Sequence, residues 1–393
     1  MNAPVQNSFL FKLSILSISL VLTVTTAVST ALPAMIAAFN QYQPTQVEML
    51  ATLPTISLLI TVLASSWIIQ RIGARRATLI GLTIALLAGL VPVFISDYAV
   101  IFVSRLLLGV GVGLFNNLAY SLIMAVYDGE ERQTMLGFQS AVGTVGNAAA
   151  SLVVGLLVTS GWQVAFNVNW LFVIPLVLFG VFATKIDQFT NPVASDNGET
   201  TPLKTKETTN MAVVGYALLM ATFFAFYFAL MLKLAGFLVE QNLGTATVAA
   251  TQLSVMSLIG LLPSLLYGQI YKRLRRLTIP VGLIAAGIGI GVIMSATSIV
   301  TVWIGILIVG FGLPVVIPAI FGKVAEVQPE GSSNLSSALM LVGINVAVFL
   351  SPQVLAIATQ LTGQTSNQAT LMVATIMMFI LAIVQLTISI LKK

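Results

Sequence analysis

Two basic side chains stand inside long apolar runs of this sequence, where a charge is unusual. Lys233 interrupts the run FALMLKLAGFL at 228–238, and Arg105 opens the run RLLLGVGVG at 105–113. A charged group inside a membrane is costly unless it faces protein or a watery cavity. Either cation could therefore pair with a carboxylate or bind an anionic substrate.

Arg105 begins a polar stripe. Helical spacing places Arg105, Gly109, Asn116 and Tyr120 on one face of a helix that is otherwise apolar. Such a stripe predicts the lining of a cavity. The alternative is a structural arginine that donates hydrogen bonds to backbone carbonyls.

Lys233 lies near the end of its apolar run, and two interpretations are open. Its ammonium group can reach the membrane interface on its methylene stem, or it can pair with Glu240 or Glu48. Alternatively, it contacts an anionic substrate at the outer mouth of a cavity.

No carboxylate is expected at mid-membrane, although proton-coupled carriers usually hold the proton on a buried Asp, Glu or His. The chain has no histidine. The candidates for proton coupling are therefore the acids expected at outer helix ends, Glu48, Asp97 and Glu240. The other acids are expected in inner loops: Asp128, Glu130, Glu131, Asp187, Asp196, Glu199, Glu207, Glu326 and Glu330.

Amides form a second group of candidates. Asn147 and Asn345, with Gln139 and Gln353, lie in apolar runs and can either bind a polar substrate or hydrogen-bond between helices. The chain has no cysteine, no histidine and no Gly-x4-Gly-Lys-Ser/Thr phosphate loop. Thiol chemistry, imidazole catalysis and ATP hydrolysis therefore lack their usual groups, and we expect neither an enzyme nor a cofactor or metal site.

The elements that carry these residues are predicted to be membrane-spanning helices. Hydrophobic residues make up 58% of the 393 positions and charged residues 7%, whereas a soluble domain carries about 25% charged residues. A spanning helix needs about 20 mostly apolar residues. Twelve such helices are predicted, near 10–38, 49–69, 77–95, 99–126, 134–159, 163–183, 211–238, 247–270, 277–296, 299–323, 334–360 and 367–391.

The basic residues predict the orientation of the chain. With both termini in the cytoplasm, every Lys and Arg except Arg105 and Lys233 falls on the inner side. The net charge of +5 is then explained by topology, and the anionic partner is the lipid surface rather than nucleic acid. A multi-pass protein of the cell membrane is expected.

One long polar stretch divides the chain. Residues 184–210 are predicted to be a cytoplasmic linker between a six-helix bundle at 1–183 and another at 211–393. The halves look repeated, because SAVGTVG at 140–146 returns as SALMLVG at 337–343, and RIGARR at 71–76 is echoed by KRLRR at 272–276. Two halves inserted in the same direction form a parallel repeat about the membrane normal.

With these features the sequence resembles the major facilitator superfamily over nearly its whole length. The loop SWIIQRIGARR at 66–76 is similar to the family's loop between helices 2 and 3, with Arg71, Gly73, Arg75 and Arg76 in place. RLLLGVGVG resembles the fourth-helix signature, and EERQTMLG at 130–137 and SGWQVAF at 160–166 look like further landmarks. The resemblance implies an inner gate at the 66–76 loop and two six-helix bundles that alternate access to a central site.

The glycine run of the fifth helix resembles the antiporter signature, but Asn147 stands where that signature has proline. The packing glycines Gly109, Gly113, Gly143 and Gly146 would let helices approach closely. The leading hypothesis is a monomeric secondary transporter that moves a small organic molecule, by efflux of drug-like or metabolite compounds and with proton coupling. The alternative is an organic or inorganic anion carrier that uses Arg105 and Lys233 as counter-charges.

Overall fold

The protein is all-α in the computed structural model, which describes residues 8–22, 24–116, 122–123, 126–127, 129–183, 208–329 and 333–391. Tyr120 and most of the predicted 184–210 linker lie outside these ranges. The helices of the first half are α1 (Phe9–Ser19), α2 (Val24–Ala27), η2 (Val28–Ala31), α3 (Leu32–Ala38), α4 (Pro44–Ile72), α5 (Ala74–Phe94), α6 (Tyr98–Asn116), α8 (Gly129–Leu157), η3 (Val158–Ser160), α9 (Trp162–Ala165), η4 (Phe166–Phe172) and α10 (Val173–Phe182). Those of the second half are α12 (Met211–Glu240), α13 (Ala246–Ile259), α14 (Leu261–Leu265), α15 (Tyr267–Leu274), η5 (Arg275–Leu277), α16 (Thr278–Met294), α17 (Ile299–Val327), α18 (Ser333–Gln360) and α19 (Asn367–Leu391).

The number of membrane spans agrees with the sequence prediction. Within the described ranges, 11 helical stretches are long and apolar enough to cross a membrane, and the count becomes 12 if the bent stretch from Phe9 to Ala38 is one span. The fold class is therefore confirmed as an all-helical, multi-pass membrane protein.

The first span is the one that differs most from expectation, because it is broken and not a single helix over 10–38. Its two parts, Phe9–Ser19 and Val24–Ala38, meet at an angle of 42°. Ser14 and Ser17 each donate a 2.7 Å hydrogen bond to the carbonyl three residues earlier, a contact that bends helices. The stretch VLTVTTAVST that follows is rich in β-branched residues, which hold a helix less well.

The described residues form two compact units. Unit 1 comprises Met1–Val28 and Leu53–Leu203. Within it α5 packs along α6 at a glycine contact, since a Cβ at Gly81 would lie 2.6 Å from the Gly111 carbonyl oxygen. Close helix approach at small residues is typical of membrane bundles.

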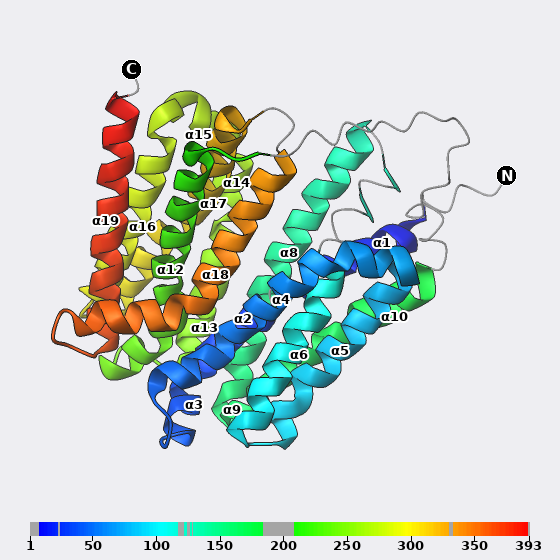
Figure 1. The fold of residues 1–393 in the computed structure, drawn as a ribbon. Helices are drawn as coiled ribbons and strands as arrows, with labels where there is room; N and C mark the ends of the chain where they lie inside the picture. The colour runs from blue at the N-terminus through cyan, green and yellow to red at the C-terminus, as the bar shows by residue number, and fades with distance from the viewer. Residues whose placement is uncertain are drawn as a thin grey trace. The chain divides into compact units, whose positions relative to one another are not determined.

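Unit 2 comprises Ser29–Thr52 and Lys204–Lys393. In it α12 packs against α18 and α19, and α16 packs against α17 and α19 (Figure 1). The contacts thus group Ser29–Thr52 with the second half of the chain. The division into bundles at 1–183 and 211–393 with a linker between them stays a prediction.

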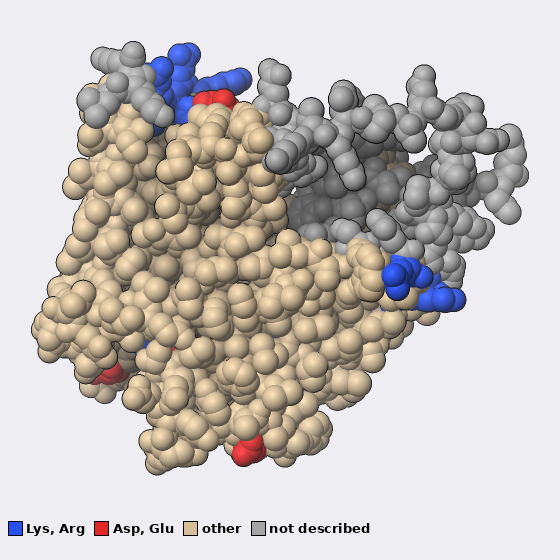
Figure 2. All heavy atoms as spheres, in the orientation of Figure 1, with Lys and Arg blue, Asp and Glu red and all other residues tan. Residues whose placement is uncertain are grey.

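The charges of unit 2 gather near its ends. Basic side chains cluster at the end where α15 and the C-terminal end of α19 lie (Figure 2), and Glu240 ends α12 at the opposite end. This distribution agrees with the predicted cytoplasmic position of the 272–276 turn.

Candidate transport and coupling site

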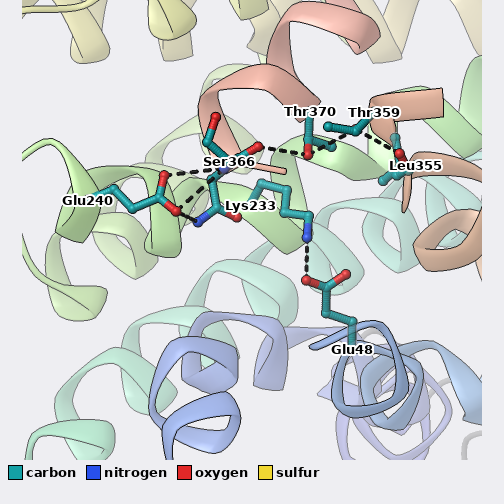
Figure 3. Close-up of polar contacts among 8 residues, drawn as sticks. Glu48, Lys233, Glu240, Leu355, Thr359, Ser366 and Thr370 are labelled. Atoms are coloured by element: carbon teal, nitrogen blue, oxygen red, sulfur yellow. Dashed lines mark hydrogen bonds and ion pairs between the residues drawn. The ribbon is translucent and has the colours of Figure 1, made fainter. Parts of the chain in front are cut away.

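The strongest candidate site is a buried ion pair between Glu48 and Lys233, both in unit 2. Lys233 on α12 donates to Glu48 Oε1 on α4, and the two side chains point toward each other (Figure 3). Glu48 is 3% exposed and Lys233 16% exposed. Lys233 is therefore paired with one of the two acids that the sequence suggested for it.

The helix boundary explains why Glu48 is buried. The sequence predicted a span from residue 49 with Glu48 at its outer end, but α4 begins at Pro44. Proline is favoured at the first helical position, where its missing N–H costs nothing. Glu48 consequently lies inside the second turn of a spanning helix.

Polar contacts around the pair fix the end of α12. Glu240 accepts a 2.6 Å hydrogen bond from the Asn367 side chain at the start of α19 (Figure 3). Gly236 makes room for this contact, because a Cβ there would lie 2.6 Å from Asn367 Nδ2. The helix that carries Lys233 is thus tied at its end to α19.

The three proposed coupling acids lie in different environments. Asp97 is exposed and caps α6 through a 2.9 Å hydrogen bond from the Val100 amide. Glu240 is also exposed. Glu48 is the buried carboxylate among the side chains that the structure describes. Of the three, Glu48 best fits the environment expected of a proton carrier.

Arg105 is fully buried on α6 in unit 1. Its Nη2 donates a 2.9 Å hydrogen bond to the Thr25 carbonyl, and its guanidinium carbon lies 5.6 Å from the centroid of the Phe166 ring. Thr25 belongs to α2, which follows the break in the first span. This geometry favours the structural interpretation of Arg105, and a substrate contact stays a prediction.

Three of the four predicted packing glycines lie where helices touch. A Cβ at Gly109 would lie 2.2 Å from the Pro54 carbonyl oxygen, and one at Gly113 would lie 2.6 Å from Thr61 Cβ. A Cβ at Gly146 would lie 2.1 Å from the Leu20 carbonyl oxygen, whereas one at Gly143 meets nothing closer than 3.6 Å. Asn116, at the end of α6, is partly buried.

The predicted amides lie on α8 and α18, and a further buried amide, which the sequence analysis did not predict, lies on α13. Asn147 is partly buried on α8, and Asn345 on α18 donates to the Leu341 carbonyl at 2.8 Å. Gln252 on α13 was not singled out, yet it is fully buried, and neither of its side-chain polar atoms has a partner among the described residues. The signal was present in the sequence, because Gln252 interrupts an apolar run as Gln139 and Gln353 do.

The predicted inner-gate loop forms a tight turn between α4 and α5. Gly73 has φ 85°, which a residue with a side chain rarely adopts. Arg75 donates a 2.8 Å hydrogen bond to the Gly180 carbonyl, and Arg71 lies over the Trp67 ring at 4.1 Å. Arg76 is exposed. Asp128 and the Glu131 side chain, two of the acids expected in inner loops, lie outside the described residues.

These helices define a polytopic membrane protein. The chain matches the family model of the Major Facilitator Superfamily over residues 14–352. It therefore belongs to that superfamily and is one of its transporters.

Individual relatives are more distant. A protein of Citrobacter koseri that carries the name multidrug resistance protein MdtD is 25% identical over 161 residues, which is 41% of this chain and 33% of that protein's own length. Among solved structures, a peptide transporter POT in complex with sulfate is similar with a TM-score of 0.78, 15% identity and coverage of 98% of this chain and 96% of that one. A D-xylose-proton symporter has a TM-score of 0.71, 16% identity and coverage of 96% and 97%. These likenesses show the fold.

Proposed function

We propose that this protein is a proton-coupled secondary transporter that exports a small organic molecule, of the drug-like or metabolite class, by alternating access. The buried ion pair between Glu48 and Lys233 carries the proposal. A carboxylate inside a membrane helix is costly and is retained where ions or protons move. Protonation of Glu48 would remove its charge and release Lys233.

The pair can couple a proton to a change of conformation. It joins the second turn of α4 to the last third of α12, so any movement that separates these helices must break it. Separating two buried charges is unfavourable, because each loses its partner without regaining water. Protonated Glu48 lowers that cost, and proton binding thereby favours the separated state.

Export is supported by the relative from Citrobacter koseri, whose name assigns it to multidrug resistance. Proton coupling is supported by the fold neighbour named as a proton symporter. The chain itself adds a small set of polar groups in apolar spans, including Gln252. Such sparse polar groups suit a mostly apolar substrate better than a heavily hydrated one.

The alternative, an anion carrier with Arg105 and Lys233 as counter-charges, receives less support from the geometry. Lys233 is matched by Glu48, and Arg105 donates to the Thr25 carbonyl while fully buried. An anionic substrate would have to displace both contacts. It would also have to compete with a carboxylate already in place.

Transport in proteoliposomes tests the proposal. The full chain is reconstituted with a panel of lipophilic cations, neutral drugs and organic anions under an imposed pH gradient, and a lumenal dye reports proton flux. The variants are Glu48→Gln and, as a matched control, Asp97→Asn. We expect substrate-dependent proton flux in the wild type and in Asp97→Asn. In Glu48→Gln, exchange of substrate should persist without gradient-driven accumulation.

Two results would contradict the proposal. Gradient-driven accumulation by Glu48→Gln at the wild-type level would remove Glu48 from coupling. Selective movement of organic anions, lost in Lys233→Met, would support the anion carrier instead.

A further inference from the structure

The basic end of unit 2 contains a hollow lined almost entirely by cations. It encloses about 510 Å³ between α15, η5 and α17, and its lining residues are Tyr271, Lys272, Arg275, Arg276 and Lys323. Among the described residues, the acid Glu326 lies beside it and accepts hydrogen bonds from Lys323 at 2.7 Å and from the Tyr271 hydroxyl at 3.3 Å. The remaining charge of the hollow is strongly positive.

The turn that supplies these cations has a strained backbone. Arg275 has φ 46° and ψ −110°, a conformation that residues other than glycine rarely adopt. Strain of this kind persists only where the surroundings enforce it and is concentrated at functional sites. Here it ends α15 abruptly and gathers Lys272, Arg275 and Arg276 around one hollow.

A second hollow of about 190 Å³ continues from the first and shares Arg276 and Lys323 with it. It also adjoins a third hollow, of about 330 Å³, with which it shares Tyr216, Gln385 and Ile388. This third hollow is a mostly apolar groove between α12 and α19, bordered by exposed Leu218 and Val384. The three hollows are therefore neighbours, and we refer to the row that they form as the path.

The charge and shape of this path select the ligand. The hollow at its basic end suits a phosphate, since arginine and lysine are the usual phosphate-binding side chains. The groove runs along two membrane-spanning helices and suits an acyl chain. The positive-inside rule places the basic end at the cytoplasmic leaflet, where anionic lipids attract Lys and Arg clusters.

We propose that this path is a binding site for one anionic phospholipid, with its phosphate among Lys272, Arg275 and Arg276 and an acyl chain in the groove between α12 and α19. The site is independent of the coupling pair, which lies at the other end of α12.

Native mass spectrometry of the purified full chain tests the site, with dioleoyl phosphatidylglycerol as the probe and dioleoyl phosphatidylcholine as the neutral comparison. We expect preferential retention of phosphatidylglycerol. Each cation near an anionic lipid contributes about fivefold to its binding constant. Arg275→Gln combined with Arg276→Gln should therefore lower the retention of phosphatidylglycerol roughly 30-fold. Arg273→Gln, which removes a charge from the same turn but not from the lining, should retain the lipid.

A second variant separates a seated lipid from diffuse attraction. Gly215 lines the groove, and a Cβ there meets nothing within 4 Å, so Gly215→Leu fills the groove while every charge stays in place. It should lose the preference for phosphatidylglycerol while unfolding at the wild-type temperature. Inorganic phosphate alone should not compete with the lipid.

Each opposite result overturns the proposal. Equal retention of the two lipids removes the headgroup site, and an equal loss in Arg273→Gln reduces the effect to general surface charge. Unchanged retention in a folded Gly215→Leu removes the acyl groove. Displacement by inorganic phosphate would make the hollow a site for the free ion.

Discussion

The first and seventh spans correspond to each other in the two halves of the chain, yet they are built differently. The first is broken into α1, α2, η2 and α3 with a 42° bend, whereas the seventh, α12, runs unbroken from Met211 to Glu240. The broken span receives a cation from another helix, Arg105, at the Thr25 carbonyl. The unbroken span carries its own cation, Lys233, and pairs it with an acid.

The glycine contacts show which positions correspond. Gly81 contacts Gly111 between α5 and α6, and Gly282 contacts Gly312 between α16 and α17. The same spacing along the chain separates Gly81 from Gly282 and Gly111 from Gly312. With that spacing, Arg105 corresponds to Ile306. Both side chains are fully buried.

The difference between the two spans indicates different roles for the buried cations Arg105 and Lys233. A continuous helix satisfies its own backbone carbonyls, so the seventh span needs no donor and an isoleucine suffices beside it. A broken helix leaves carbonyls without intrahelical partners, and in a membrane each is costly. Arg105 therefore belongs with the break in the first span, which leaves Lys233 for the coupling role that we propose.

The largest expected effect is at the seventh span. Lys233→Met leaves Glu48 buried without its counter-charge, and breaking a buried pair in this way costs about 3–5 kcal/mol. We expect a lower unfolding temperature in detergent. The double variant Glu48→Gln with Lys233→Met should recover most of the loss, because neither charge remains. If Lys233→Met is as stable as the wild type, the ammonium group of the wild-type protein reaches the interface and does not depend on Glu48.

The next effect is at the first span. Arg105→Ile places in unit 1 the residue that unit 2 has at the corresponding position, and removes the donor to Thr25. We expect a loss of about 1–3 kcal/mol, the usual cost of an unsatisfied buried polar group. The control is Ile306→Val, for which about 0.5–1.5 kcal/mol is expected. Unchanged stability together with lost anion transport would instead make Arg105 a substrate contact.

The smallest expected difference is the one between the two glycine contacts. A Cβ at Gly111 would lie 2.7 Å from the Gly81 carbonyl oxygen, and one at Gly312 would lie 3.1 Å from the Gly282 carbonyl oxygen. Overpacking costs about 1–3 kcal/mol, so Gly111→Ala should be near the upper end and Gly312→Ala near the lower. Gly322→Ala meets nothing within 4 Å and should be neutral in the same thermal unfolding assay. Equal losses of stability at Gly111 and Gly312 would show that the two pairs of helices move apart equally easily to admit a methyl group.

Hydropathy and charge were sufficient to predict the fold class and number of spans. A run of about 20 apolar residues has few alternatives to a spanning helix, because backbone groups in lipid must be satisfied within the segment. The break in the first span was not predicted. Ser14 and Ser17 donate to backbone carbonyls just before it, and hydropathy does not report such contacts.

The site was predicted less completely. Glu48 was named as a partner of Lys233, but its burial was not predicted. It follows from the start of α4 at Pro44, which lies four residues before Glu48 and outside the apolar run used to predict the span. Gln252 was missed although it breaks an apolar run as clearly as Gln353. Which amide is enclosed without a partner depends on the packing of α13 against its neighbours, and no local pattern encodes that.

The hydrogen bonds of α19 give this helix a mechanical role. Near its first residues, Asn367 contacts Glu240 and Gln368 donates to the Met294 carbonyl at 3.1 Å; near its last, Ser389 donates to the Arg276 carbonyl at 3.1 Å. A helix that is hydrogen-bonded to its neighbours at both ends tilts less readily than one that is bonded at a single end. We therefore expect α19 to keep its tilt within unit 2 when the helices beside it move.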